Sequence, residues 1–129
     1  MGVADFKKLL VWQKAHALAV NVHAVAGRMR GPAHLSLRSQ LSRASMSIDA
    51  NISEGRGRPT ERDFVRFLNI AISSAHEVES HLLMAKDTGA LPKADCLMLL
   101  EQLIEVRRML YGLVKHVQKK IDSDNQARC

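Results

Sequence analysis

The chain has 129 residues, of which 47% are apolar and 25% are charged, and these proportions favour a folded globular protein over a disordered or membrane-embedded one. Its length suits one domain with one core, which must be largely aliphatic because only one Trp, one Tyr and three Phe are present. The formal net charge of +6 attracts polyanions such as nucleic acid without specifying one. Alternatively, this charge merely keeps the protein soluble.

The sequence contains neither a signal-peptide pattern nor a membrane-span pattern. Its first apolar patch, residues 9–12, is too short for a signal peptide and is followed by polar residues. No run approaches the ~18 apolar residues that cross a bilayer. Cys96 and Cys129 lack the spacing of a metal site, and reduced thiols suit them better than a disulfide. We therefore expect a cytoplasmic protein with no metal, no cofactor and no membrane partner.

The first predicted helix covers residues 8–28, where apolar residues recur at spacings of four and three, the period of a helix face that packs in a bundle. Gly31 and Pro32 end the pattern, because proline lacks an amide hydrogen and disfavours helix in the residue before it. The second predicted helix covers residues 35–54. Gly55 is expected to end it as a left-handed C-terminal cap.

The third predicted helix covers residues 61–88. Its start is predicted by a capping box, in which Thr60 accepts a hydrogen bond from the backbone of Asp63. Gly89 and Pro92 punctuate its end.

The fourth predicted helix covers residues 93–121, and the polar tail after Asp122 is expected to be loose. Short connections between four helices favour antiparallel neighbours, and no strand-like alternation competes with this pattern. The sequence therefore predicts a single all-α domain over residues 1–129, an antiparallel up-down-up-down four-helix bundle.

Small hydrogen-bonding side chains follow the second and third predicted helices on stripes outside the core positions. On the second helix this stripe is expected nearly opposite Leu41 and Ile48. An ordinary solvated face would instead be rich in Lys and Glu. We therefore predict that these stripes are buried between copies of the chain. The candidate interface residues are Gln40, Ser47, Asn51, Glu54, Gly55, Asn69 and Ser73.

The fourth predicted helix carries more apolar residues than one bundle seam needs, which also favours self-association. The alternative is that this helix is simply the most buried of the four. The surplus residues are Leu100, Ile104, Met109, Val114 and Ile121.

Patterns of catalysis are weak throughout the chain. His76 and His81 are five residues apart, so they do not share a helix face as the two histidines of a zinc-protease helix do. Gly55 and Gly57 lack the lysine and the preceding strand of a phosphate-binding loop. The forward sequence contains no Glu-x-x-His, the motif of carboxylate-bridged di-iron bundles. We therefore expect no enzymatic activity.

The segment from Arg38 to Arg66 contains arginine but no lysine. The planar guanidinium group binds phosphate or carboxylate with two parallel hydrogen bonds, which the lysine ammonium does not. The alternative is salt bridging to the four acids of the segment. Glu54, near a helix C-terminus that disfavours anions, is expected to have a specific partner there. The candidate nucleic-acid-binding residues are Arg38, Arg43, Arg56, Arg58, Arg62 and Arg66.

Several of these residues form recognisable blocks. Near the start the chain reads Trp12-Gln13-Lys14-Ala15, and from Gln40 to Arg58 it contains Arg-Ala, Ser-Ile, Ala-Asn-Ile and Glu-Gly at fixed spacings. Phe64-x-x-Phe67-Leu68 and Glu77-x-Glu79 continue the pattern. Over nearly its whole length the chain resembles the bacterial 23S rRNA intervening-sequence proteins, four-helix bundles encoded inside intervening sequences of 23S ribosomal RNA genes.

The resemblance implies a bundle assembled as a ring, commonly a homopentamer, with no known catalysis. It also implies a distant kinship with the basic accessory bundle of diversity-generating retroelements, which works with a reverse transcriptase and nucleic acid. The chain departs from the family pattern at 29–34, where members often carry an aromatic-Pro and acidic stretch. It also departs at Ser73-Ser74, where Gly-Ser is frequent.

Two functions are compatible with these observations. The first is a non-enzymatic homo-oligomer that binds RNA or a nucleoprotein through arginine-rich surfaces. With few aromatic residues to stack on bases, such binding would depend on phosphate contacts and on salt. The second is a structural or protein-adaptor oligomer whose arginines join the subunits to one another.

Overall fold

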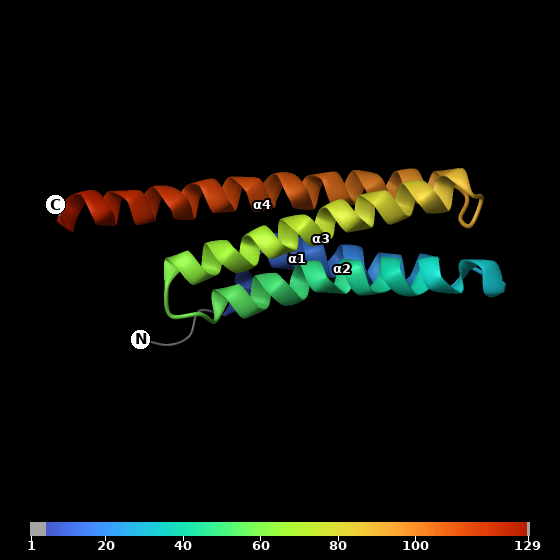
Figure 1. The fold of residues 1–129 in the computed structure, drawn as a ribbon, viewed down its shortest axis with the longest axis horizontal. Coiled ribbons are helices and arrows are strands. Elements are labelled where there is room, and N and C mark those ends of the chain that lie inside the picture. The colour runs from blue at the N-terminus through green and yellow to red at the C-terminus, as the bar shows by residue number, and fades with distance from the viewer. Residues whose placement is uncertain (1–4, 129) are drawn as a thin grey trace.

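The computed structural model describes residues 5–128, and Cys129 lies outside the described residues. Four long helices, α1 (Leu10–Ala26), α2 (Leu35–Arg56), α3 (Glu61–Asp87) and α4 (Lys93–Arg128), are joined by short connections, and the chain reverses direction between consecutive helices (Figure 1). Two short 3-10 turns, η1 (Phe6–Lys8) and η2 (Pro32–His34), precede α1 and α2. No strand occurs between residues 5 and 128, so the all-α prediction is confirmed.

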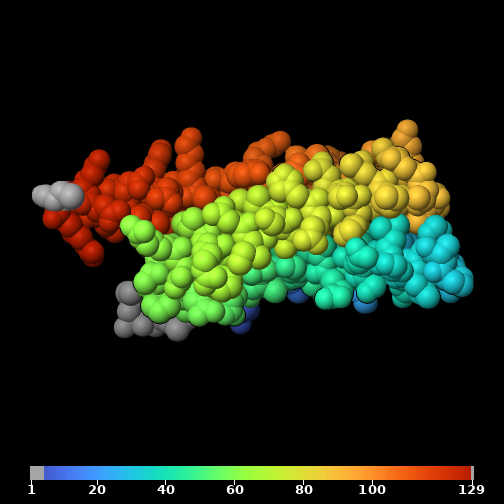
Figure 2. All heavy atoms as spheres, in the orientation of Figure 1, coloured from blue at the N-terminus to red at the C-terminus, as the bar shows by residue number. Residues whose placement is uncertain are grey.

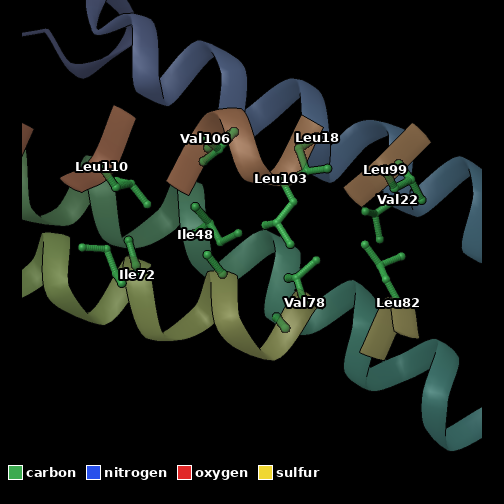
Figure 3. Packing of buried hydrophobic residues seen from close by; sticks show 14 of the residues in the cluster. Leu18, Val22, Ile48, Ile72, Val78, Leu82, Leu99, Leu103, Val106 and Leu110 are labelled. Carbon is green, nitrogen blue, oxygen red and sulfur yellow. The ribbon is translucent and has the colours of Figure 1, made fainter. Parts of the chain in front are cut away.

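The four helices pack around one aliphatic core. Each helix lies beside two neighbours: α2 and α4 both pack beside α1 and α3, whereas within the described residues the Cα atoms of α1 and α3, and of α2 and α4, stay more than 8 Å apart. Burial of one leucine side chain contributes about 1.5–3 kcal/mol, so the fully buried residues dominate stability. Figure 3 shows part of this core, with Leu18, Val22, Ile48, Val78, Leu82, Leu99, Leu103, Val106 and Leu110 pointing toward one another.

The ends of the helices agree with the predictions except at three places. The first helix is two residues shorter than predicted at each end: the 3-10 turn η1 precedes it, and it ends at Ala26. The tail after Asp122 was expected to be loose, but α4 continues to Arg128. With a rise of 1.5 Å per residue, α4 is about 54 Å long and α3 about 40 Å. In Figure 1 the end of α4 therefore extends past the turn between α2 and α3.

Gly55 is the third difference. It does not form a left-handed cap, because α2 continues to Arg56 and, among residues 5–128, positive φ is found only at Gly31 and Gly89. Gly55 is instead buried where α2 meets α3. A Cβ atom at this position would lie 2.6 Å from Cβ of Phe67, a distance that real Cβ contacts do not reach. The glycine is required there by the close approach of the two helices.

The surplus apolar residues of α4 pack mainly against the core of their own subunit. Ile121 is buried, and Leu100, Met109 and Val114 pack partly buried against the core. Only Ile104 of this set is exposed, by 41%. The alternative that α4 is a well-buried helix thus accounts for most of the surplus.

Candidate functional site

Four of the six candidate arginines lie at one end of the bundle. Arg56 ends α2, Arg58 lies in the turn, and Arg62 and Arg66 occupy the first two turns of α3. The hydrogen bond from the backbone N–H of Asp63 to Oγ1 of Thr60, at 3.1 Å, fixes the start of α3 and confirms the predicted cap.

The other two candidate arginines lie elsewhere. Along the axis of α2, Arg43 and Arg38 are about 20 Å and about 27 Å from Arg56. The structure therefore groups four of the six.

Two phenylalanine rings contact three of these four guanidinium groups. The guanidinium carbons of Arg58 and Arg66 lie 4.9 Å and 4.5 Å from the ring centroid of Phe67, and that of Arg56 lies 5.6 Å from the ring centroid of Phe64. Attraction between a cation and an aromatic face orients such groups at the surface. The missing side chain of Gly55 lets α2 approach the helix that carries both rings. We call Arg56, Arg58, Arg62, Arg66, Phe64 and Phe67 the arginine cluster.

Acidic side chains neutralise only part of the arginine cluster. Nη2 of Arg58 donates a hydrogen bond to Oε1 of Glu54 at 2.7 Å, which identifies the partner expected for that carboxylate. Arg66 Nε lies 3.6 Å from Oδ1 of Asp63. Both pairs are exposed, and such pairs contribute about 0–1 kcal/mol, so they can yield to or share a stronger anion.

The remaining two arginines make no ion pair with any of the described residues. Nε of Arg56 is buried and has no hydrogen-bond acceptor among the described residues. Arg62 is exposed. The cluster therefore retains guanidinium N–H groups that can donate hydrogen bonds to an anion.

The end of α4 extends the arginine cluster into a groove. The groove has a volume of about 430 Å³ and lies between the start of α3 and the end of α4. Figure 2 shows the end of α4 projecting beyond the start of α3. The groove is lined by Arg62, Val65, Arg66, Asn69, Gln118, Ile121, Asp122 and Asn125.

A second hollow beside it adds basic side chains that the sequence analysis missed. His116, Lys119 and Lys120 of α4 line it together with Glu61 and Asp124. These three residues lie inside the fourth predicted helix, but only the segment from Arg38 to Arg66 was considered as a binding surface. The available signal was the run of Lys115, Lys119 and Lys120, which share neighbouring positions on one helix.

The family of the chain follows from its match to a family model. The model of the 23S rRNA-intervening sequence protein family matches residues 7–112, more than half of the chain. The chain belongs to this family. A comparison with curated proteins finds no match.

A solved structure supports the fold of this 23S rRNA-intervening sequence family member. The crystal structure of a protein with unknown function from the S23 ribosomal protein family of Bacteroides thetaiotaomicron superimposes with a TM-score of 0.77. The two chains are 24% identical, and the match covers 82% of this chain and 99% of the other. At this identity the likeness establishes the fold alone.

The polar stripe of α2 points in a different direction from the one predicted. Oγ of Ser47 lies 2.8 Å from Oγ of Ser74 on α3, and Nδ2 of Asn51 donates hydrogen bonds to the carbonyl oxygen and the hydroxyl of Ser47. The stripe therefore follows the flank of α2 that faces α3, and does not lie opposite the core. In this family member, these polar groups are satisfied inside the subunit.

The other candidate interface residues are scattered. Nε2 of Gln40 donates to Oγ of Ser36 one turn earlier, Ser73 is exposed, and Asn69 lines the groove beside the arginine cluster. Arg43 lines a shallow pocket between α2 and α3.

Two of the six histidines, His16 and His76, have hydrogen-bond partners in this family member. Nδ1 of His16 lies 2.8 Å from Oδ2 of Asp49, and Nε2 of His76 lies 3.2 Å from the hydroxyl of Tyr111. Over residues 5–128 no three His, Cys, Asp or Glu side chains gather as metal ligands would, and no helix is long and apolar enough to cross a membrane. Burial raises the pKa of the Cys96 thiol, which makes this thiol a poor nucleophile.

Proposed function

We propose that this family member is a non-enzymatic cytoplasmic homo-oligomer that binds RNA, alone or within a nucleoprotein, through the phosphate groups. The observation that carries the proposal is the arginine cluster, in which three guanidinium groups pack on two phenylalanine rings at one end of the bundle. Guanidinium groups held in this way present preformed forks that match phosphate oxygens.

The surroundings of the cluster favour an extended polyanion over a small ligand. Lys119 and Lys120 of α4 continue the positive charge beyond Arg62, and amide side chains line the intervening groove. The hollows are open and shallow, whereas pockets for small molecules enclose most of their ligand. A chain of phosphates can contact several such points at once, without any reading of base sequence.

Assembly would strengthen this binding. The subunit of the proposed oligomer is the antiparallel bundle, and family resemblance supports a ring, with a homopentamer as the expected form. In a ring whose subunits are related by rotation, every copy presents its arginine cluster in an equivalent position. An RNA that engages two copies gains effective concentration, so its affinity exceeds that for one subunit by a large factor.

The test is an RNA-binding titration across a salt series with the double variant Arg58→Ala/Arg62→Ala. We expect at least a tenfold loss of RNA affinity at about 100 mM salt. The affinity should also depend less steeply on salt, because phosphate contacts are removed. The matched control is Lys86→Ala/Lys93→Ala, which removes the same charge at the other end of the bundle. Equal losses of RNA affinity in both variants would show that only the net charge matters, and would reject the site.

The alternative function, a structural or protein-adaptor oligomer, is favoured by the ion pairs Arg58–Glu54 and Arg66–Asp63. In that case the arginines serve the protein itself. The double variant Arg58→Ala/Arg62→Ala would then change oligomer mass or stability and leave RNA affinity unchanged. Mass and affinity measured on the same sample separate the two functions.

A further inference from the structure

Helix α1 is unusually poor in charge for a helix with a solvent-facing side. Among its residues only Lys14 is a Lys, Arg, Asp or Glu, and that side chain turns to the flank of α4, where Nζ lies 3.2 Å from Oε1 of Glu105. A helix that is apolar or small all round is normally buried. One exposed stripe of α1 and its C-cap follows spacings of four and three: Gln13, Ala17, Val20, Ala24 and Gly27.

Helix α2 continues this surface. Its outward residues Ser39, Met46 and Ala50 are exposed and uncharged, and Ser53 is half-buried. Nδ1 of His16 lies 2.8 Å from Oδ2 of Asp49, so a hydrogen bond bridges the two helices on the same side. Arg38 lies only at the rim, in the first turn of α2. We call this surface the α1–α2 face; it is broad, poor in charge and built mostly of small side chains, with Asp49 as its carboxylate.

The opposite side of the bundle, between α3 and α4, has protruding apolar side chains instead. On α4, Leu97, Ile104 and Tyr111 recur every seven residues and are 46%, 41% and 51% exposed, and Leu83 of α3 is 39% exposed beside them. Two polar groups of this surface pair with each other, since Nη1 of Arg107 donates to Oε1 of Glu79 at 2.7 Å. We call this surface the α3–α4 face.

The two faces complement each other in shape and charge. Large side chains on one face fit between the small side chains of the other, as knobs fit holes between packed helices. Arg108 lies one turn beyond Ile104, is exposed and pairs with no acid among residues 5–128, whereas Asp49 is the carboxylate of the α1–α2 face. In Figure 3 their neighbours Val106 and Ile48 lie at the same position along the bundle.

If the two copies lie parallel and without a shift along the bundle axis, docking brings Arg108 of one copy level with Asp49 of the next. Arg108 and Asp49 would then pair across the contact, so burial would isolate neither of these two charges.

The size of the surface also suits a partner subunit. Helix α1 is about 25 Å long and two packed helices are about 20 Å wide, which gives an outline of about 500 Å². That outline is of the same order as the ~800 Å² that each partner buries in a stable interface.

We propose that the α1–α2 face of one copy docks on the α3–α4 face of a second copy. The contact is head-to-tail, because each copy contributes a different surface and keeps the other one available. Repetition of such a contact builds assemblies of more than two copies, whereas a two-fold contact of a face with itself stops at a dimer. This inference rests on the oligomer in the proposed function and identifies its surfaces; it does not depend on RNA.

The test uses one exposed substitution on each face. Ala24→Arg places a charge on the α1–α2 face, and Ile104→Glu places one on the α3–α4 face. Each variant alone should have the mass of one 14.4 kDa subunit by native mass spectrometry or light scattering at micromolar concentration. In a one-to-one mixture the intact face of each variant meets the intact face of the other, so the mixture should form a dimer of twice 14.4 kDa.

Matched controls carry the same chemistry outside both faces: Ala127→Arg near the end of α4, and Met84→Glu, whose side chain is 55% exposed on α3. Both should keep the wild-type mass. Val20→Lys repeats the α1–α2 test, and circular dichroism checks that each variant is folded. If Ile104→Glu keeps the wild-type mass while Ala24→Arg does not, the α1–α2 face binds itself and the head-to-tail contact is overturned.

A wild-type mass for Ala24→Arg, or a mixture that stays monomeric, overturns the proposal as well. A monomeric wild type would overturn both this contact and the proposed oligomer. Loss of RNA binding with normal assembly would count only against the proposed RNA function. The two failures are therefore distinguishable on the same samples.

Discussion

Gly55 joins the fold to the arginine cluster. Its Cα hydrogen faces the side chains of Phe64 and Phe67, and an added methyl group would meet Cβ of Phe67 at 2.6 Å. Since that atom is fixed to the backbone, Gly55→Ala must push α2 and α3 apart. We expect a loss of about 1–3 kcal/mol in the free energy of unfolding, measured by urea denaturation.

The control is Gly112→Ala in α4. This exposed helical glycine has open space around its missing side chain, so alanine should stabilise the protein by about 0.5–1 kcal/mol. A stabilising Gly55→Ala would mean that the helices are not in close contact there.

The ion pair between Glu79 of α3 and Arg107 of α4 makes the stability of the protein depend on pH. The hydrogen bond from Arg107 lowers the pKa of the Glu79 carboxyl below its ordinary value. A group with a lowered folded-state pKa stabilises the protein above the unfolded-state pKa, here about 4.3, and loses that contribution as pH falls through the folded-state pKa.

Glu79→Gln should therefore cost about 0.5–1 kcal/mol at pH 7, a small value because the Glu79 side chain is about one-third exposed. It should cost nothing once pH is below the folded-state pKa. Unfolding measured from pH 7 to pH 2 checks this, with Glu77→Gln on the exposed side of α3 as the control. An equal cost at both ends of the range would show that the amide disturbs packing and not charge.

At the scale of one helix, the start of α3 depends on Thr60. Removal of its hydroxyl group in Thr60→Ala leaves the backbone N–H of Asp63 without its acceptor, at a cost of about 1 kcal/mol. Thr60→Ser keeps the oxygen and should be close to neutral. The difference in melting temperature between the two variants isolates the cap from the loss of a methyl group.

Helix periodicity was sufficient to predict which segments are helical, because burial of a three-four stripe dominates the choice of secondary structure. It could not predict where α4 ends: the residues after Ile121 are polar, and their helix continues without a core to bury. Nor could it orient the stripe of Ser47 and Asn51, since the direction toward α3 depends on how two helices rotate against each other. For the same reason, periodicity could not predict that Lys119 and Lys120 lie near the arginine cluster.

For the whole molecule, the net charge of +6 is visible in the sequence, but its distribution is a property of the fold. Helices that reverse direction bring the end of α2, the start of α3 and the end of α4 to one end of the bundle. Residues as distant in sequence as Arg62 and Lys119 thereby line neighbouring hollows. A cationic surface of this kind binds phosphates by displacing counterions, so its affinity must fall with salt.

That reasoning gives a quantitative prediction for Lys119→Ala/Lys120→Ala. If each lysine contacts one phosphate of single-stranded RNA, the slope of log affinity against log salt should become shallower by about 0.7 per contact, or about 1.4 for the pair. The change should be the same for RNAs of different sequence, because no base is read. An unchanged slope would place the RNA away from the end of α4 and confine it to the arginine cluster.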